Sequence, residues 1–220
     1  MKKLYGIGAG PGAADLLTIR AVNIIKDAKV IFAPNNKGKN MALDTVGEYI
    51  GGKRVILIDF PMGSVKTEDY IKAANIIYRE IPEGGHGAFL TIGDPMIYST
   101  FIYIMDLLVV KDIEIEVVPG IPSFVAAAAA SKVPLTVKGD SFLLVDEFDQ
   151  ALLDKANSFA LLKTLGEKED ILEELEKNNF DYKYVKRVSL DNEKILEDKE
   201  KIIEDRDYIS LILARRKEEK

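Results

Sequence analysis

Short apolar runs alternate with amphipathic segments along the first half of the chain. The spacing of apolar residues distinguishes buried strands from helices that cover a sheet. Apolar runs at 4–7, 30–33, 54–58, 87–92 and 114–118 predict strands, and periodic segments at 15–25, 41–50, 68–80 and 101–108 predict helices between them. Strands that alternate with helices indicate an α/β fold with a mainly parallel sheet covered on both faces.

The second half of the chain has a different pattern. After Pro119-Gly120-Ile121-Pro122-Ser123, the alanine run 126–130 predicts a helix. An Asp191-Asn192 turn between two strand-like segments indicates antiparallel pairing, and therefore a mixed second sheet. We expect two α/β domains, residues 1–118 and 119–220. Further strands are predicted at 141–145, 158–162, 182–188 and 208–214, with helices at 150–156, capped by Asp149, and 167–178.

The segment from Gly93 to Thr100 is the first candidate site. It joins the strand 87–92 to the helix 101–108. Gly93 can adopt backbone angles closed to other residues, and Pro95 stiffens the turn. Asp94 places a charged acceptor at the carboxyl end of a strand, where open α/β sheets bind ligands. Gly-Asp-Pro is also common turn chemistry, so this segment alone does not establish a site.

A second turn, Gly8-Ala9-Gly10-Pro11-Gly12, also joins a strand to a helix, as nucleotide-binding turns do. Pro11 removes an amide that could bind phosphate. The next strand ends in Pro34-Asn35-Asn36 and not in an acidic residue that would bind a ribose. These departures from the dinucleotide-binding pattern disfavour binding of NAD, although the loop could still approach a ligand closely.

Composition and charge restrict the possible functions. The 220 residues are 47% hydrophobic and 30% charged, with a net charge of −6, which disfavours nucleic-acid binding. The chain has no cysteine and one histidine, so we expect neither thiolate catalysis nor a metal site. A catalytic triad would require His86, which we predict to be a solvated loop residue.

The chain also shows no sign of membrane targeting. The N-terminus enters a strand pattern almost at once, and no apolar run reaches the roughly 18 residues that span a bilayer. We therefore expect a cytoplasmic protein with no membrane partner.

Three stretches occur together in a fixed order: the glycine loop at 8–12 followed by Leu16-Leu17-Thr18, the Gly93-Asp94-Pro95 turn, and Pro119–Ser123 before the alanine helix and Pro134-Leu135. Their order and spacing resemble the tetrapyrrole (corrin/porphyrin) methyltransferase family over essentially the whole chain. The stretches at 59–62, 98–101 and 208–211 resemble the branch that methylates C(20) of precorrin-2, or of its cobalt complex, in cobalamin biosynthesis. Ala13 departs from the acidic residue that relatives usually have after the glycine loop.

The resemblance implies that S-adenosylmethionine binds in a cleft between two α/β domains and leaves as S-adenosylhomocysteine. It also implies a homodimer. By position, the cofactor-binding residues would be Pro11, Ile92, Gly93, Asp94, Ile97, Ser123, Phe124, Leu162, Lys163, Thr164, Ser210, Ile212 and Leu213.

The implied reaction needs no protein nucleophile, because positive sulfur already activates the methyl group. Catalysis would come mainly from positioning, which supplies about 7–11 kcal/mol in favourable systems. We assign Tyr98 and Ser99 as catalytic candidates that orient the substrate, with Tyr98, Thr100, Lys37 and Lys39 as substrate-binding candidates. Lysines would offset the carboxylates of an anionic tetrapyrrole. Tyr98, Asp94 and water stay open as acceptors of the departing proton.

Three alternatives remain at the level of sequence. The chain could methylate another ring carbon, serve as a non-catalytic nucleotide-binding α/β sensor, or be a dinucleotide oxidoreductase. Between the metal-free and cobalt-containing substrates, precorrin-2 and cobalt-factor II, we favour the second.

Overall fold

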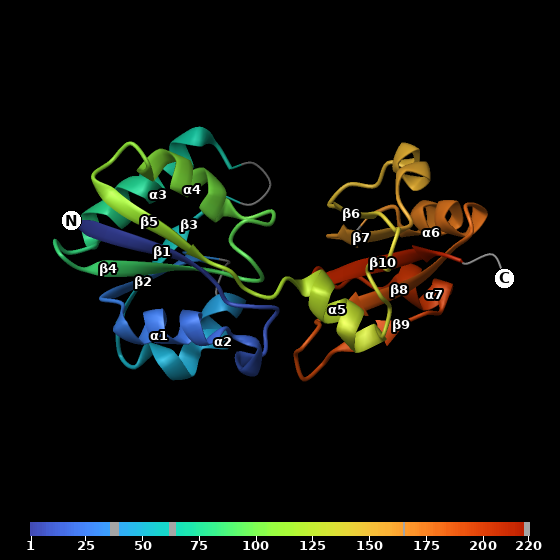
Figure 1. Cartoon of the computed structure of the whole chain (residues 1–220), viewed down its shortest axis with the longest axis horizontal. Coiled ribbons are helices and arrows are strands. Elements are labelled where there is room, and N and C mark those ends of the chain that lie inside the picture. Colours follow the sequence, from blue (N-terminus) through green and yellow to red (C-terminus); the bar gives the residue numbers. More distant parts are fainter. Residues whose placement is uncertain (36–39, 62–64, 165, 218–220) are drawn as a thin grey trace. The chain divides into compact units, whose positions relative to one another are not determined.

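The computed structural model describes residues 1–35, 40–61, 65–164 and 166–217. The chain forms two compact units, Met1–Pro122 and Ser123–Lys220 (Figure 1). The sequence-based boundary after residue 118 lies four residues before the end of the first unit, which includes residues up to Pro122. Among the described residues, no helix is both long and apolar enough to cross a membrane.

The first unit contains a five-stranded sheet in the order β3-β2-β4-β1-β5. All of its pairings are parallel, which confirms the predicted parallel sheet. Parallel strands place their carboxyl ends at one edge, and there the glycine loop and the Gly93 turn leave the sheet. The strands are β1 (Lys2–Gly8), β2 (Val30–Asn35), β3 (Arg54–Asp59), β4 (His86–Thr91) and β5 (Ile113–Val118).

Helices cover both faces of this sheet, α1 and α2 on one side and α3 and α4 on the other (Figure 1). Successive residues of a strand point to opposite faces of the sheet. Ile31 therefore packs with Ile25 and Val46 on one face, whereas Phe32 packs in the core on the opposite face. The helices are α1 (Ile19–Asp27), α2 (Met41–Ile50), α3 (Thr67–Glu80) and α4 (Thr100–Leu108).

Three local expectations need correction. The first helix starts at Ile19, capped by Thr18, whose hydroxyl accepts from the Ala21 amide at 3.2 Å; Ala14–Leu16 form a separate 3-10 turn, η1. The third helix starts at Thr67, one residue before the predicted start, and at that end the Asp69 carboxylate accepts from the Lys66 amide at 3.1 Å. His86 is the first residue of β4, partly buried, with its ring edge-on to Tyr5 at 5.4 Å.

The second unit contains a five-stranded mixed sheet in the order β6-β7-β10-β8-β9. Among the described strands of this sheet, only β6 and β7 pair in parallel, and the antiparallel β8–β9 pairing confirms the predicted hairpin. One face packs against α6 and α7, and the other packs against α5. The elements are α5 (Ser123–Ser131), β6 (Phe142–Val145), η2 (Gln150–Lys155), β7 (Ser158–Leu162), α6 (Lys168–Lys177), β8 (Phe180–Lys186), β9 (Lys194–Leu196), α7 (Lys199–Glu204) and β10 (Ser210–Arg216).

Candidate functional site

The two turns identified in the sequence meet at the carboxyl edge of the first sheet. Strands β1 and β4 are neighbours, and just beyond them Gly10 and Gly93 form an antiparallel bridge. The Gly93 amide donates to the Gly10 carbonyl at 2.6 Å, and the Gly10 amide donates to the Gly93 carbonyl at 3.2 Å. Both glycines have positive φ, 71° and 70°, which L side chains rarely adopt. The glycine loop and the Gly93 turn therefore form one continuous backbone surface.

Asp94 joins this surface to the loop after β5. Its Oδ1 accepts from the Met96 amide at 2.8 Å, and its Oδ2 accepts from the Gly120 amide at 3.1 Å. The sequence left open whether Asp94 binds a ligand or supports the turn, and the structure shows that it supports the turn. Carboxylate oxygens each accept more than one hydrogen bond, so this support does not prevent an additional contact with a ligand.

Close approach of neighbouring backbone segments explains why positions 8 and 120 are occupied by glycine. A Cβ atom on Gly120 would overlap the Gly93 carbonyl oxygen and the main chain of Gly8, and one on Gly8 would overlap Gly120. Side chains at these positions would separate the ends of β1, β4 and β5. By contrast, a Cβ atom on Gly93 would meet only Pro122 Cα, at 3.8 Å, so the requirement for glycine there comes from its φ.

The residues after the turn have different surroundings. Ser99 is 6% exposed and caps α4, because its Oγ accepts from the Phe101 amide at 3.0 Å. Its Oγ also lies 3.4 Å from Thr91 Oγ1, which leaves it mainly a supporting role. Tyr98 is 48% exposed and holds a positive φ of 45°, a strained conformation of the kind that occurs at functional sites. Thr100 is the partly buried first residue of α4.

Apolar side chains lie exposed on the same turn. Ile92 is 41% exposed and Met96 is 47% exposed, whereas Ile97 is partly buried and Pro11 is buried. This edge of the first unit therefore offers hydrogen-bonding backbone and exposed apolar side chains together, a combination typical of small-molecule sites.

An aromatic cluster, which the candidates from sequence did not include, lies at the same sheet edge. Phe60 directly follows β3, while Tyr70 and Tyr103 belong to the first turns of α3 and α4. The rings of Tyr70 and Tyr103 are stacked at 4.8 Å, and Phe60 lies 5.9 Å from Tyr70. Aromatic residues in the first turn of helices that start at a ligand-binding edge are the sequence signal that could have identified this cluster.

In the second unit, several predicted cofactor-binding residues lie together. The end of β7, Leu162, pairs with Leu211 at the start of β10. Next to it, the hydroxyls of Thr164 and Ser210 lie 3.0 Å apart, and Ser210 Oγ donates to the Asp207 carbonyl at 2.8 Å. Lys163 has a positive φ of 59°, and its Nζ lies 3.6 Å from Asp146.

The other predicted residues of this unit have packing roles. Ile212 and Leu213 are each 1% exposed and face opposite cores of the sheet. Ser123 is the first residue of α5, and Phe124 stacks on Phe142 with ring centroids 5.6 Å apart. The structure therefore uses these side chains, apart from Ser123, to build the second unit.

A polar cluster next to Ser210 contains several residues with shifted pKa values. The Asp205 carboxylate accepts from the Tyr184 hydroxyl at 2.9 Å and from Lys186 Nζ. Desolvation opposes its ionisation, but the bonds from Lys186 and the Asp207 amide prevail and lower the pKa of Asp205. Burial is the largest cause that raises the pKa of Tyr184 to about 12, and burial lowers the pKa of Lys168, which donates to the Asp205 carbonyl.

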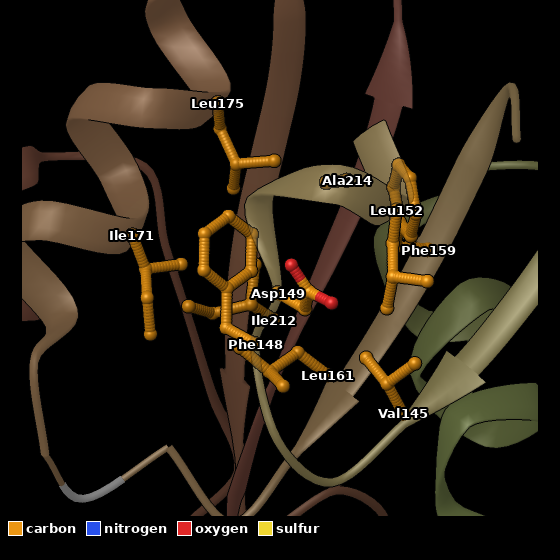
Figure 2. A pocket seen from close by; sticks show the side chains of 10 residues that line it. All are labelled: Val145, Phe148, Asp149, Leu152, Phe159, Leu161, Ile171, Leu175, Ile212 and Ala214. Carbon is orange, nitrogen blue, oxygen red and sulfur yellow. The ribbon is translucent and has the colours of Figure 1, made fainter. Parts of the chain in front are cut away.

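An internal cavity of the second unit does not offer a binding site. It has a volume of about 10 Å³, roughly the space of one water molecule. Figure 2 shows the ten lining side chains, of which only Asp149 is charged. Asp149 caps η2 by accepting from the Ala151 amide at 2.9 Å, as the sequence predicted. The cavity is therefore a small gap in the apolar core.

Two further predictions concern charged ligands. The substrate-binding candidates Lys37 and Lys39 lie outside the described residues. In the described part of the chain, no three His, Cys, Asp or Glu side chains are grouped so that they could hold a metal ion.

Comparison with known proteins agrees with the motif resemblance. The tetrapyrrole (corrin/porphyrin) methylases match residues 3–203. The chain is 36% identical to a probable cobalt-precorrin-2 C(20)-methyltransferase of Methanocaldococcus jannaschii, over 98% of this chain and 97% of that protein. It is 34% identical to the cobalt-precorrin-2 C(20)-methyltransferase of Salmonella typhimurium, over 74% of this chain and 73% of that protein.

A solved structure supports the fold. Uroporphyrin-III C-methyl transferase of Thermus thermophilus, complexed with S-adenyl homocysteine, superposes with a TM-score of 0.71. The match covers 97% of each chain at 21% sequence identity. Two α/β units, one with a parallel sheet and one with a mixed sheet, are therefore the architecture of this fold.

Proposed function

Because the chain belongs to the tetrapyrrole (corrin/porphyrin) methylase family, we propose that it transfers a methyl group from S-adenosylmethionine to C(20) of a precorrin-2-type tetrapyrrole. The observation that carries this proposal is the 36% identity with a probable cobalt-precorrin-2 C(20)-methyltransferase over nearly the full length of both proteins. The names of both curated relatives favour the cobalt-containing substrate. The reaction would belong to cobalamin biosynthesis.

The carboxyl edge of the first sheet fits S-adenosylmethionine. When bound, this cofactor supplies a methyl group on positively charged sulfur, which is already an electrophile. The bridged turns at Gly10 and Gly93 present a rigid backbone, and Ile92 and Met96 offer apolar surface beside it. We propose that Ile92, Gly93 and Ile97 contact the cofactor. Asp94 would act chiefly as a positioning residue, because both of its oxygens hold backbone amides.

In the second unit, the end of β7 and the start of β10 are the second proposed cofactor contact. The adjacent Thr164 and Ser210 hydroxyls provide donors and acceptors for polar groups such as those of adenosine. Leu162 and Lys163 flank them, and Ser123 supplies a further hydroxyl at the start of α5. The contacts predicted for Pro11, Phe124, Ile212 and Leu213 stay predictions, and the packing of these side chains leaves mainly their backbone for a ligand.

Residues just beyond the Gly93 turn would orient the substrate. Tyr98 combines an exposed side chain with a strained backbone conformation, and it would contact the bound macrocycle. Ser99 would act through its cap on α4, which fixes the position of Tyr98. Tyr103 is exposed and stacks on the partly buried Tyr70, so this pair offers a flat aromatic surface suited to the face of a tetrapyrrole.

Two binding measurements and one assay test the proposal against its alternatives. Isothermal titration calorimetry should detect S-adenosylhomocysteine and no binding of NAD. Incubation with S-adenosylmethionine and cobalt-factor II or precorrin-2 should then give a product in which one methyl group has replaced a hydrogen. Binding of S-adenosylhomocysteine without methyl transfer to either substrate would favour a sensor, and binding of NAD alone would favour an oxidoreductase.

A further inference from the structure

The polar cluster next to Ser210 has no part in the proposed reaction, although its charged groups lie largely inside the second unit. Tyr184 and Lys168 are buried, and the side chains of Lys186 and Asp205 are only 18% and 10% exposed. Burial of an ion pair costs desolvation energy, and well-packed apolar residues in its place are often as stable or more stable. Stability is therefore a weak reason for this cluster, and its place beside the proposed cofactor contact points to another.

Asp205 is the centre of the cluster. Its Oδ1 accepts from the Tyr184 hydroxyl at 2.9 Å and from the Asp207 amide at 2.8 Å, and its Oδ2 accepts from Lys186 Nζ. Desolvation opposes ionisation of this carboxyl, but these hydrogen bonds lower its pKa, so it is a carboxylate at neutral pH. A carboxylate only accepts, and the single proton of the Tyr184 hydroxyl is therefore directed at Asp205.

Asp207 fixes the rest of the segment that leads into β10. Its Oδ2 accepts from Arg187 Nε, and its Oδ1 accepts from the Ile209 amide at 3.1 Å. Its main-chain carbonyl accepts from Ser210 Oγ at 2.8 Å. Because the Asp207 amide is itself bound to Asp205, the two carboxylates together determine where the Ser210 hydroxyl lies.

These hydrogen bonds also assign the protons of the Thr164–Ser210 pair. Each hydroxyl has one proton, and Ser210 directs its proton at the Asp207 carbonyl, so Thr164 is the donor in the 3.0 Å contact between the two hydroxyls. Burial raises the pKa of Tyr184 to about 12, and hydrogen bonding to Ser210 and Thr164 partly offsets this rise, so the Tyr184 hydroxyl lies beside the pair. Of the donors and acceptors that two hydroxyls provide, this arrangement leaves the acceptor lone pairs for a ligand.

We propose that Asp205 and Tyr184 are positioning residues, which hold the Thr164–Ser210 pair as a hydrogen-bond acceptor for an N–H or O–H group of the nucleoside in the methyl donor. This role rests on the proposed function, which brings the cofactor to the pair. Tyr184 is fully buried and therefore acts only through the two hydroxyls. Lys186 keeps Asp205 ionised, and so maintains the direction of the hydrogen bonds.

Tyr182 provides a matched control on the same strand. It lies two residues before Tyr184 in β8 and contributes to the same core, and its hydroxyl donates to the Glu176 carboxylate at 2.7 Å. It pairs with Ala214, four residues along β10 from Ser210. Phenylalanine at either tyrosine removes one hydroxyl-to-carboxylate hydrogen bond and keeps the ring. The two variants should therefore lose comparable stability and differ in their effect on the site.

Isothermal titration calorimetry with S-adenosylhomocysteine separates the two variants. Tyr184→Phe should bind about threefold to tenfold more weakly than the natural protein, the range expected for one hydrogen bond. Tyr182→Phe should bind as tightly as the natural protein. Equal affinities for a folded Tyr184→Phe and the natural protein, or equal losses in the two variants, would overturn the proposal.

A double-mutant cycle tests whether Tyr184 acts through the hydroxyl pair. The combination of Thr164→Val and Ser210→Ala removes both hydroxyls and should itself weaken binding of S-adenosylhomocysteine. Adding Tyr184→Phe should weaken binding no further, since residues that act through one network are not additive. Full additivity would show that Tyr184 acts by another route and would contradict the proposal.

If Tyr184→Phe does not fold, Asp205→Asn takes its place in both measurements. An amide donates as well as accepts, so the Tyr184 proton would lose its fixed direction and affinity for S-adenosylhomocysteine should again fall. Unchanged affinity of a folded Asp205→Asn would then overturn the proposal. A natural protein that binds no S-adenosylhomocysteine would contradict the proposed function and this role together, whereas binding that all variants share equally with the natural protein would contradict this role alone.

Discussion

The carboxylate of Asp94 lies 3.1 Å from the amide of Gly120 and holds two loops of the first unit together. These residues are 26 positions apart, one after β4 and the other after β5. The same carboxylate fixes its own turn through the Met96 amide. The part of the proposed methyl-donor site at the carboxyl edge of the first sheet is therefore held in place before any ligand binds, as catalysis by positioning requires.

Replacement of Asp94 by alanine should release both amides. Hydrogen bonds to a charged group contribute about 1.5–3 kcal/mol each, so affinity for S-adenosylhomocysteine should fall about tenfold or more. Asp94→Asn keeps one acceptor oxygen, so its affinity for S-adenosylhomocysteine should fall less than that of Asp94→Ala. Calorimetry measures both affinities, with thermal unfolding as the check on folding. Equal affinity for Asp94→Ala and the natural protein would show that the bonds to Met96 and Gly120 do not prepare the site.

Gly120→Ala should destabilise the first unit, because the new Cβ atom would overlap backbone atoms of Gly93 and Gly8. Overpacking of this kind typically costs about 1–3 kcal/mol, which thermal or urea unfolding would resolve. Gly47→Ala is the matched control. Gly47 lies in α2 with open space where its Cβ would be, so alanine should be neutral or stabilising there. A Gly120→Ala protein as stable as Gly47→Ala would refute the close approach of the three loops.

Tyr103→Ala should raise the KM for the tetrapyrrole several-fold while leaving affinity for S-adenosylhomocysteine unchanged. The reason is that removal of the ring exposes one side of the stacked pair with Tyr70, and such a pair contributes about 0.5–1.5 kcal/mol beyond its buried area. Tyr103→Phe keeps the ring and should behave like the natural protein. Steady-state kinetics with each variant is the measurement, and an unchanged KM for Tyr103→Ala would exclude the aromatic surface from substrate binding.

Asp205 should make stability depend on acid pH. The bonds from Lys186 and the Asp207 amide hold its folded-state pKa below its unfolded value, despite the opposing desolvation. Its contribution is therefore complete above the unfolded pKa of about 3.9 and disappears as pH falls through the lower folded-state pKa. Urea unfolding of Asp205→Asn should show a smaller stability at neutral pH and a shallower loss in acid. Parallel curves for the two proteins would mean that Asp205 does not contribute in this way.

Local pattern was sufficient to predict most elements of the fold. Buried strand segments such as 30–33 and 87–90 contain no polar side chains because both faces of the sheet are covered, and this signal can be recognised without knowing which strands pair. Even the cap of η2 by Asp149 followed from residue type and position. The start of α1 did not, because the periodic pattern from Asp15 continues through a 3-10 turn. The short helix α7 was also missed, since its six residues give little periodicity.

The candidate site was predictable only in part, because its geometry depends on distant pairs. The sequence placed Gly93 and Asp94 at a strand end, but the role of Asp94 depends on Gly120 and could not be chosen locally. Likewise, the stacking of Tyr70 on Tyr103 depends on how α3 packs beside α4. The order β3-β2-β4-β1-β5, which leaves β3 at the edge, is a property of the whole sheet.

The position of the transferred methyl group tests the central claim most directly. The protein would be incubated with an S-adenosylmethionine whose methyl carbon is isotope-labelled, and with precorrin-2 or cobalt-factor II in separate reactions. NMR of each isolated product would locate the label. We predict a single new methyl group at C(20), with faster turnover of the cobalt-containing substrate. A label at any other ring carbon, or no transfer to either substrate by a protein that binds S-adenosylhomocysteine, would contradict the account.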